Sequence, residues 1–183
     1  MILGMIAFTY FFVRQLPEAS PDTTLIGAPE TTTTTSSDTT ETTEPENELD
    51  PDTQAYLAEL DSINSELQLL NTEIVTVNDG FDAEPREVEY TDAEDRFEAV
   101  STSTQALAER LEGLTVPAGL EQNQAAMQRN MDLAVRAASD ALAGLRSTDS
   151  GGLRRSSVEA YTIATEDFST EVTNAKNAAG VSA

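Results

Sequence analysis

Apolar residues in the second part of the chain recur at alternating steps of three and four, which is the spacing of one face of an α-helix. The first such stripe consists of Tyr56, Leu60, Ile63, Leu67, Leu70, Ile74 and Val77. Asp50 suits the N-cap and Pro51 the first helical position, while Gly80 has the place that glycine often takes just beyond a helix. These signals predict a helix over residues 51–78.

A second segment repeats this spacing after a short break. Its stripe consists of Ala93, Phe97, Val100, Thr104, Leu107, Leu111 and Leu114. Thr91 followed three residues later by Glu94 has the pattern of a capping box, which predicts the start of the helix. Gly113 and Pro117 mark its end, so we expect a helix over residues 92–113.

Two further helices are predicted over residues 119–146 and 152–179. The third stripe is Met127, Met131, Ala134, Ala138, Ala141 and Leu145, widened by Leu133, Ala137 and Leu142. Its many alanines predict close approach to a neighbouring helix rather than a bulky core. The fourth stripe is Val158, Tyr161, Thr165, Phe168, Val172, Ala175 and Ala179, and it follows the turn "STDSGG".

Four helices of similar length joined by short turns predict an all-α fold, an antiparallel up-down-up-down four-helix bundle over residues 51–180. The heptad-like stripes also fit a long coiled-coil oligomer. Short connections at residues 115–119 and 147–151 favour the bundle, and dimerisation of such a bundle stays open.

Residues 1–15 begin with an apolar run from Met1 to Val13 that Arg14 closes. Thirteen helical residues reach about 20 Å, less than the roughly 30 Å hydrocarbon layer of a membrane. We interpret the run as a membrane anchor, part of a transmembrane helix that starts upstream of Met1. The alternatives are a short cleaved signal sequence, which would make the protein secreted, and a buried helix of a soluble protein.

Residues 16–50 have the composition of a disordered stalk rich in Thr, Pro and acids. The tract "TTTTTSSDTTETTEPE" offers almost no apolar surface whose burial could offset the entropy of ordering it. Stretches rich in Ser, Thr and Pro between an anchor and a folded domain are typical of cell-surface stalks. A cytoplasmic tail is the alternative, and the apolar run before it favours the surface.

Several chemistries are excluded by residue types that the chain lacks. It has no cysteine and no histidine, which removes disulfides, thiolate chemistry, the commonest zinc ligand and Ser-His-Asp triads. Lys176, its one lysine, lies outside any phosphate-binding loop motif. A net charge of −23 argues against nucleic acid and anionic lipid as partners. The acidity is typical of solubility or of adaptation to high salt.

The connection "DGFDAEPREVEY" at residues 79–90 is the first candidate site, because it is long and acidic. Its carboxylates suggest a weak cation site formed by Asp79, Asp82, Glu84 and Glu87. A calcium-loop register with Gly80 at the sixth position fails, since valines and Arg86 fall where ligands belong. A solvated acidic loop is the simpler interpretation.

Two other sets of residues have both a functional and a structural interpretation. Met127 and Met131 can line a groove for an apolar ligand, or they can be core. Arg146, Arg154 and Arg155 fall near one end of the predicted bundle, where they can receive an anionic group or remain solvated beside nearby acids.

Charge also divides between the predicted helices. With Arg129 and Arg136, the arginines just named belong to the third and fourth helices, whereas acids concentrate in the first and second, which predicts modest surface ion pairs between helices. The acid pairs Glu94/Glu98 and Glu109/Glu112 lie off the stripes and are expected to be solvated.

These patterns assign no catalytic, cofactor-binding or metal-binding residue and no cofactor. We therefore expect a protein that is not an enzyme, held in the cell membrane by a single N-terminal span, with its bundle outside the cytoplasm as a binding or scaffolding module. Its expected partners are the membrane and another protein. The alternative function is an extracytoplasmic domain that senses a ligand or a cation.

Overall fold

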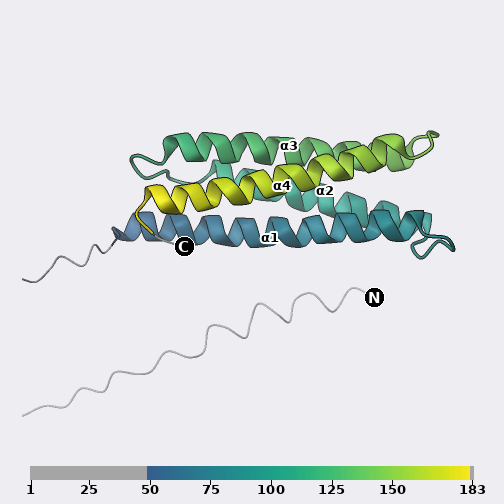
Figure 1. Ribbon diagram of the computed structural model, residues 1–183, viewed down its shortest axis with the longest axis horizontal. Coiled ribbons are helices and arrows are strands. Elements are labelled where there is room, and N and C mark those ends of the chain that lie inside the picture. Colours follow the sequence, from purple (N-terminus) through teal and green to yellow (C-terminus); the bar gives the residue numbers. More distant parts are fainter. Residues whose placement is uncertain (1–48, 182–183) are drawn as a thin grey trace, which may run out of the picture. The chain divides into compact units, whose positions relative to one another are not determined.

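The structure, a computed structural model, describes residues 49–181. Within this range there are four helices and no strand: α1 (Pro51–Asp82), α2 (Tyr90–Glu112), α3 (Glu121–Arg146) and α4 (Gly152–Ala178). Consecutive helices run in opposite directions, as Figure 1 shows. The predicted all-α, four-helix bundle is confirmed for this part of the chain.

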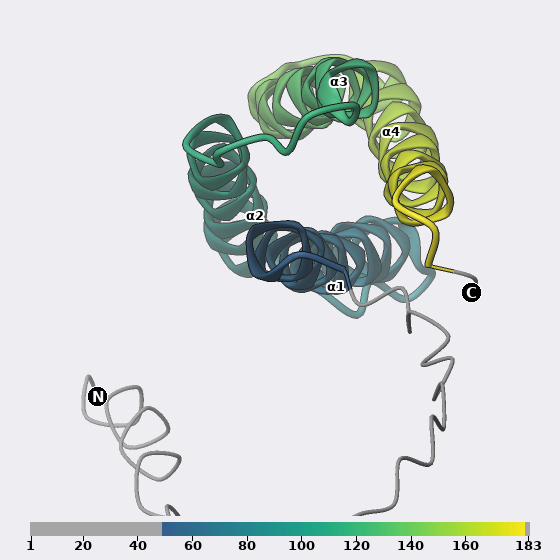
Figure 2. The same ribbon diagram turned by 90° about the vertical axis from the view of Figure 1, so that its left-hand side faces the viewer.

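Each helix packs against two others and leaves the third at a distance. Close backbone approaches join α1 to α2, α2 to α3, α3 to α4 and α4 back to α1, while the diagonal pairs make none. Figure 2 shows this closed ring end-on. The apolar stripes of all four helices therefore meet along one central core.

The core consists largely of the predicted stripe residues. Those of the first two stripes are buried apart from Leu70 of α1 and Leu114, which follows the end of α2; both are half-buried at the edge of the core. Leu133 is an error in the predicted α3 stripe, because its side chain points outward and is 52 % exposed. Two residues along a helix correspond to roughly half a turn, so Leu133 points away from the fully buried Met131 and cannot reach the core.

The start of α1 is as predicted, but its end is not. Asp50 accepts hydrogen bonds from the backbone N–H groups of Asp52 and Thr53, both at 3.1 Å. Gly80 does not end the helix, which continues to Asp82. A Cβ at Gly80 would lie 2.6 Å from Cγ2 of Val88, so glycine here makes room for the connection to α2.

The predicted capping box of α2 is wrong. The helix starts at Tyr90 with Glu89 at the N-cap, and no side chain caps it. Glu94 points instead to Arg146 of α3, whose Nε lies 2.6 Å from its Oε1. With Glu89 at the N-cap, Thr91 lies within the first turn and Glu94 in the second, so neither side chain has the position that a capping box requires.

α3 and α4 make the closest pair, as the alanines predicted. Ala134, Ala138 and Ala141 are fully buried. Further along, a Cβ at Gly144 would lie 2.5 Å from the backbone nitrogen of Arg154. Small side chains on α3 thus bring the two backbones together, and this approach places Arg154.

The predicted anchor (residues 1–15) and nearly all of the predicted stalk (residues 16–50) lie outside the described residues. From residue 49 to residue 181, no helix has the length and apolarity needed to cross a membrane.

Candidate functional site

Arg154 is the largest fully buried side chain in residues 49–181 and is only 2 % exposed. It belongs to the first turn of α4, four residues before the buried Val158 and seven before the buried Tyr161. This spacing puts Arg154 on the core face of α4. The long side chain therefore enters the end of the bundle, where α1 and α4 meet.

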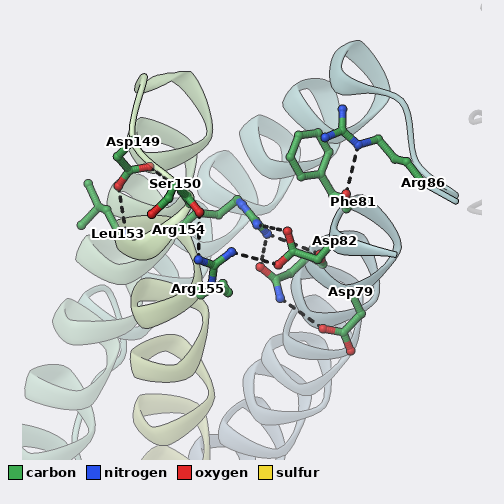
Figure 3. A network of polar contacts seen from close by, with 11 residues as sticks. Asp79, Phe81, Asp82, Arg86, Asp149, Ser150, Leu153, Arg154 and Arg155 are labelled. Atoms are coloured by element: carbon green, nitrogen blue, oxygen red, sulfur yellow. Dashed lines mark hydrogen bonds and ion pairs between the residues drawn. The ribbon is translucent and has the colours of Figure 1, made fainter. Parts of the chain in front are cut away.

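Polar groups of α1 receive the guanidinium, as Figure 3 shows. Nη1 donates to Oδ1 and to the backbone oxygen of Asn78, and Nη2 lies 2.5 Å from Oδ1 of Asp82. The Phe81 ring lies beneath it, with 5.0 Å between the ring centroid and Cζ of Arg154. We call Asn78, Phe81, Asp82, Arg154 and Arg155 the Arg154 cluster.

Arg155 completes the cluster from the solvent side. Its Nη1 lies 3.4 Å from the second carboxylate oxygen of Asp82, and its Nη2 donates to the backbone oxygen of Ser150 at 2.8 Å. Its side chain is 48 % exposed. The two neighbouring arginines thus share one acid from opposite sides, one buried and one in water.

The turn before α4 is held by Asp149. Its carboxylate accepts from the backbone N–H groups of Gly151 (2.7 Å) and Leu153 (3.2 Å). Those bonds, first the one from Leu153 and then the one from Gly151, hold the pKa of Asp149 below its usual value. A carboxylate at the positive end of α4 also favours the helix electrostatically.

The three arginines predicted to form an anion site do not converge. Arg146 bonds to Glu94 and Glu98 of α2, at 2.6 and 3.0 Å, while Arg154 and Arg155 both turn to Asp82 of α1. The solvated interpretation is also wrong for Arg154. Each of these positive charges is met by acids of the same chain.

The acidic connection does not form the suggested cation site. Asp82 is occupied by arginines, and Asp79 accepts from the Asn78 amide at 3.1 Å. Arg86 folds back over the Phe81 ring at 4.0 Å and donates to the Phe81 backbone oxygen. In the described part of the chain, no three acids lie close enough to hold a metal ion together.

Two buried hydrogen bonds cross the diagonals of the bundle. Tyr161 of α4 and Thr104 of α2 are joined by 2.8 Å between their hydroxyl oxygens. At the other end, the Tyr56 hydroxyl of α1 donates to Oε1 of Gln124 in α3 at 2.7 Å, and Gln124 donates to the backbone oxygen of Leu111. Burial raises the pKa of both tyrosines to about 12.

Ion pairs line the seams between helices. α1 and α2 are joined by Arg96 to Glu73 (2.6 Å) and by Arg110 to Glu59 and Glu66. α1 and α4 are joined by Lys176 to Asp61 (2.6 Å) as well as by the Arg154 cluster. The predicted ion pairs between acids of the first two helices and bases of the last two are confirmed. Two arginines of α2, Arg96 and Arg110, also pair with acids of α1. Exposed pairs of this kind contribute little individually.

The remaining candidates belong to packing or to the surface. Met127 and Met131 are 0 % and 1 % exposed, so both are core. Only Met131 also borders a groove, which lies between α2 and α3 and has Glu109, Glu112 and Asp132 in its lining. Glu109 and Glu112 are exposed, as predicted. Glu94 and Glu98 are not simply solvated, because both bond to Arg146.

The interior therefore offers little for chemistry. In residues 49–181, the buried ionisable side chains are Tyr56, Tyr161 and Arg154, each bonded to groups of the same bundle, and no Asp or Glu is buried. These three buried groups are thus all engaged by other groups of the same bundle.

Comparison with known protein families, curated proteins and solved structures finds no match to this chain.

Proposed function

We propose that the protein is a non-enzymatic, membrane-anchored module that holds an acidic helical bundle outside the cytoplasm for contact with another protein. The observation that carries the proposal is that the buried polar side chains bond to one another across the bundle. The Arg154 cluster and the two diagonal hydrogen bonds join helices to one another and leave no buried acid or base in the described residues ready to act on a substrate. Binding through the outer surface is the role that such a bundle supports best.

The anchoring part of the proposal is supported by the sequence. The apolar run at residues 1–13 precedes a Thr-rich, acidic tract, and the bundle follows at Asp50. This order is that of a domain carried away from a membrane on a spacer. The strongly negative net charge keeps such a domain soluble and free of anionic lipid heads.

Extraction of membranes from the native cells at alkaline pH tests the anchor. The full chain is expected to remain with the membrane pellet, because alkaline carbonate releases proteins that are held only by charge. A variant lacking residues 1–15 is the control and is expected in the supernatant. Recovery of the full chain in the soluble fraction would overturn the proposal.

A further inference from the structure

A cavity of about 320 Å³ lies beside the Arg154 cluster, at the end of the bundle where α1 leads into α2 and α3 leads into α4. Its lining includes residues of both connections and the buried Arg154. Figure 3 shows two of its sides, one with Phe81 and Arg86 and the other with Asp149 and Ser150. Sites for small molecules begin at roughly 300 Å³, so this cavity has room for a ligand of few atoms. We call it the Arg86 cavity.

Arg86 lines this cavity without an acidic partner. Glu84 and Glu87 are close to it in the chain, yet no acid in residues 49–181 forms an ion pair with its guanidinium, whereas Arg154 pairs with Asp82. The Nε–H group donates to the backbone oxygen of Phe81 at 3.1 Å, and Cζ lies 4.0 Å from the centroid of the Phe81 ring. These contacts orient the guanidinium and leave both Nη groups without an acceptor in the described part of the chain.

The two acids in the lining, by contrast, are already bonded. Asp82 is held by Arg154 and Arg155, and Asp149 accepts from two backbone N–H groups. Together with Arg86, three arginines stand against two aspartates at this end of the bundle. The excess of one positive charge favours an anion in the cavity, although the protein as a whole is strongly negative.

Aromatic and apolar side chains form another part of the lining. The rings of Phe81 and Tyr90 meet edge to face with 6.4 Å between their centroids, and Leu145 contributes from the end of α3. The Tyr90 hydroxyl makes no hydrogen bond to any other residue from 49 to 181, and Tyr90 is 40 % exposed. A ligand that combines an acidic group with a small apolar body is therefore matched on both parts.

We propose that the Arg86 cavity binds a small organic carboxylate, with Arg86 bonding to the acid and Phe81 and Tyr90 contacting its apolar part. A guanidinium and a carboxylate are both planar and form two parallel hydrogen bonds. Because Nε already donates to Phe81, the two Nη groups of Arg86 supply this pair of bonds. A single negative charge suits the site better than a phosphate dianion, since the acidic surface repels each added charge.

Titration of the purified full chain with benzoate, followed by saturation-transfer NMR, tests the site. Benzoate joins a carboxylate to an aromatic ring, and benzamide is its neutral counterpart of nearly the same shape. We expect a Kd on the order of 1 mM for benzoate, as for a small ligand in an open cavity, and at least about tenfold weaker binding of benzamide. Equal binding of the two compounds, or no binding of benzoate in the millimolar range, would overturn the inference.

A matched pair of charge substitutions locates the site. Arg86→Gln is expected to weaken benzoate binding at least about tenfold, because it removes the charged donors. Arg136→Gln changes the net charge by the same amount at an exposed arginine of α3 and is expected to leave the Kd unchanged. Both side chains are exposed, so both variants are expected to fold, which circular dichroism verifies. Benzoate binding that survives Arg86→Gln, or that weakens equally in both variants, contradicts the assignment.

Inorganic phosphate separates a carboxylate site from a site for anions in general. At the concentration of benzoate, phosphate is expected to leave the benzoate complex largely intact. Displacement of benzoate by phosphate would show that the cavity does not select a carboxylate. The inference adds a small ligand to the proposed binding role and concerns the bundle alone, so its failure leaves the membrane anchor to be decided by the alkaline extraction.

Discussion

Arg154 and Arg155 are consecutive residues that bind the two oxygens of one carboxylate, that of Asp82, from opposite environments. Arg154 is 2 % exposed and Arg155 is 48 % exposed. The pair therefore provides an internal comparison of a buried and a solvated arginine with the same partner. Its position, where α1 meets α4, makes it a measure of what holds that end of the bundle together.

Replacing Arg154 is expected to destabilise the bundle far more than replacing Arg155. Arg154→Ala leaves a cavity and removes the donors to Asn78, and the loss is expected to be roughly 3 kcal/mol of unfolding free energy. Arg155→Ala removes an exposed pair and is expected to cost less than about 0.5 kcal/mol. Urea titrations followed by circular dichroism measure both, and equal losses would show that Arg154 is not held as described.

Substitution of Gly144 tests the close approach of α3 and α4. A methyl group there would meet the backbone of Arg154 at 2.5 Å, and backbone atoms cannot give way as a flexible side chain can. Gly144→Ala is expected to cost about 2 kcal/mol by overpacking. Gly113→Ala is the control, because its nearest neighbour would lie at 3.4 Å and its φ is −76°. Gly113→Ala is expected to raise the unfolding free energy by about 0.5 kcal/mol. A Gly144→Ala variant as stable as the unchanged protein would contradict the close approach of α3 and α4.

Alkaline pH is expected to weaken the fold through the buried tyrosines. Burial raises the pKa of Tyr56 and Tyr161 to about 12, whereas an unfolded tyrosine titrates near 10. The folded state therefore holds the phenol protons more tightly, and its stability, complete below pH of about 10, is lost as pH rises toward 12.

The variant with both Tyr56→Phe and Tyr161→Phe separates this effect from general alkaline unfolding. Without the two phenols, its unfolding free energy is expected to fall less between pH 10 and 12 than that of the unchanged protein, although it starts about 2 kcal/mol lower for two lost hydrogen bonds. Parallel slopes for the two proteins would mean that these tyrosines titrate normally.

Much of the fold could be predicted from the sequence because the stripes are regular. Apolar side chains at steps of three and four leave one consistent way to bury them, and Asp50 with Pro51 fixed the start of α1. The errors at Gly80 and Leu133 concern the end of a helix and the edge of a stripe. The other errors came where a polar residue bonds to a partner distant in sequence. Glu94 had the local pattern of a capping box, but its partner Arg146 lies 52 residues away.

The same reason explains why the Arg154 cluster was missed. Extending the α4 stripe back from Val158 by one turn reaches Arg154, and this was the available signal. A long charged residue at such a position usually extends into water, so its burial depended on Asn78 and Asp82 being at the same end of the bundle. Their proximity is a property of the assembled helices and not of either segment.

The acids of α1 show the limit of composition in the same way. The sequence predicted that acids concentrate in the first and second helices, but not on which side of each helix they lie. Four acids of α1 fall at the seams, where Arg96, Arg110 and Lys176 meet them: Glu59, Asp61, Glu66 and Glu73. Which side of a helix is charged depends on where the neighbouring helices lie, and that became clear only with the bundle closed.

Labelling of intact cells tests the central claim, that this bundle acts outside the cytoplasm. The chain has no cysteine, so Ser139→Cys on the exposed side of α3 is a single reporter. A membrane-impermeant maleimide is expected to label it before the cells are broken, to the same extent as after lysis. A cytoplasmic protein with a surface cysteine is the control and should react only after lysis. Labelling of Ser139→Cys only after lysis would contradict the account.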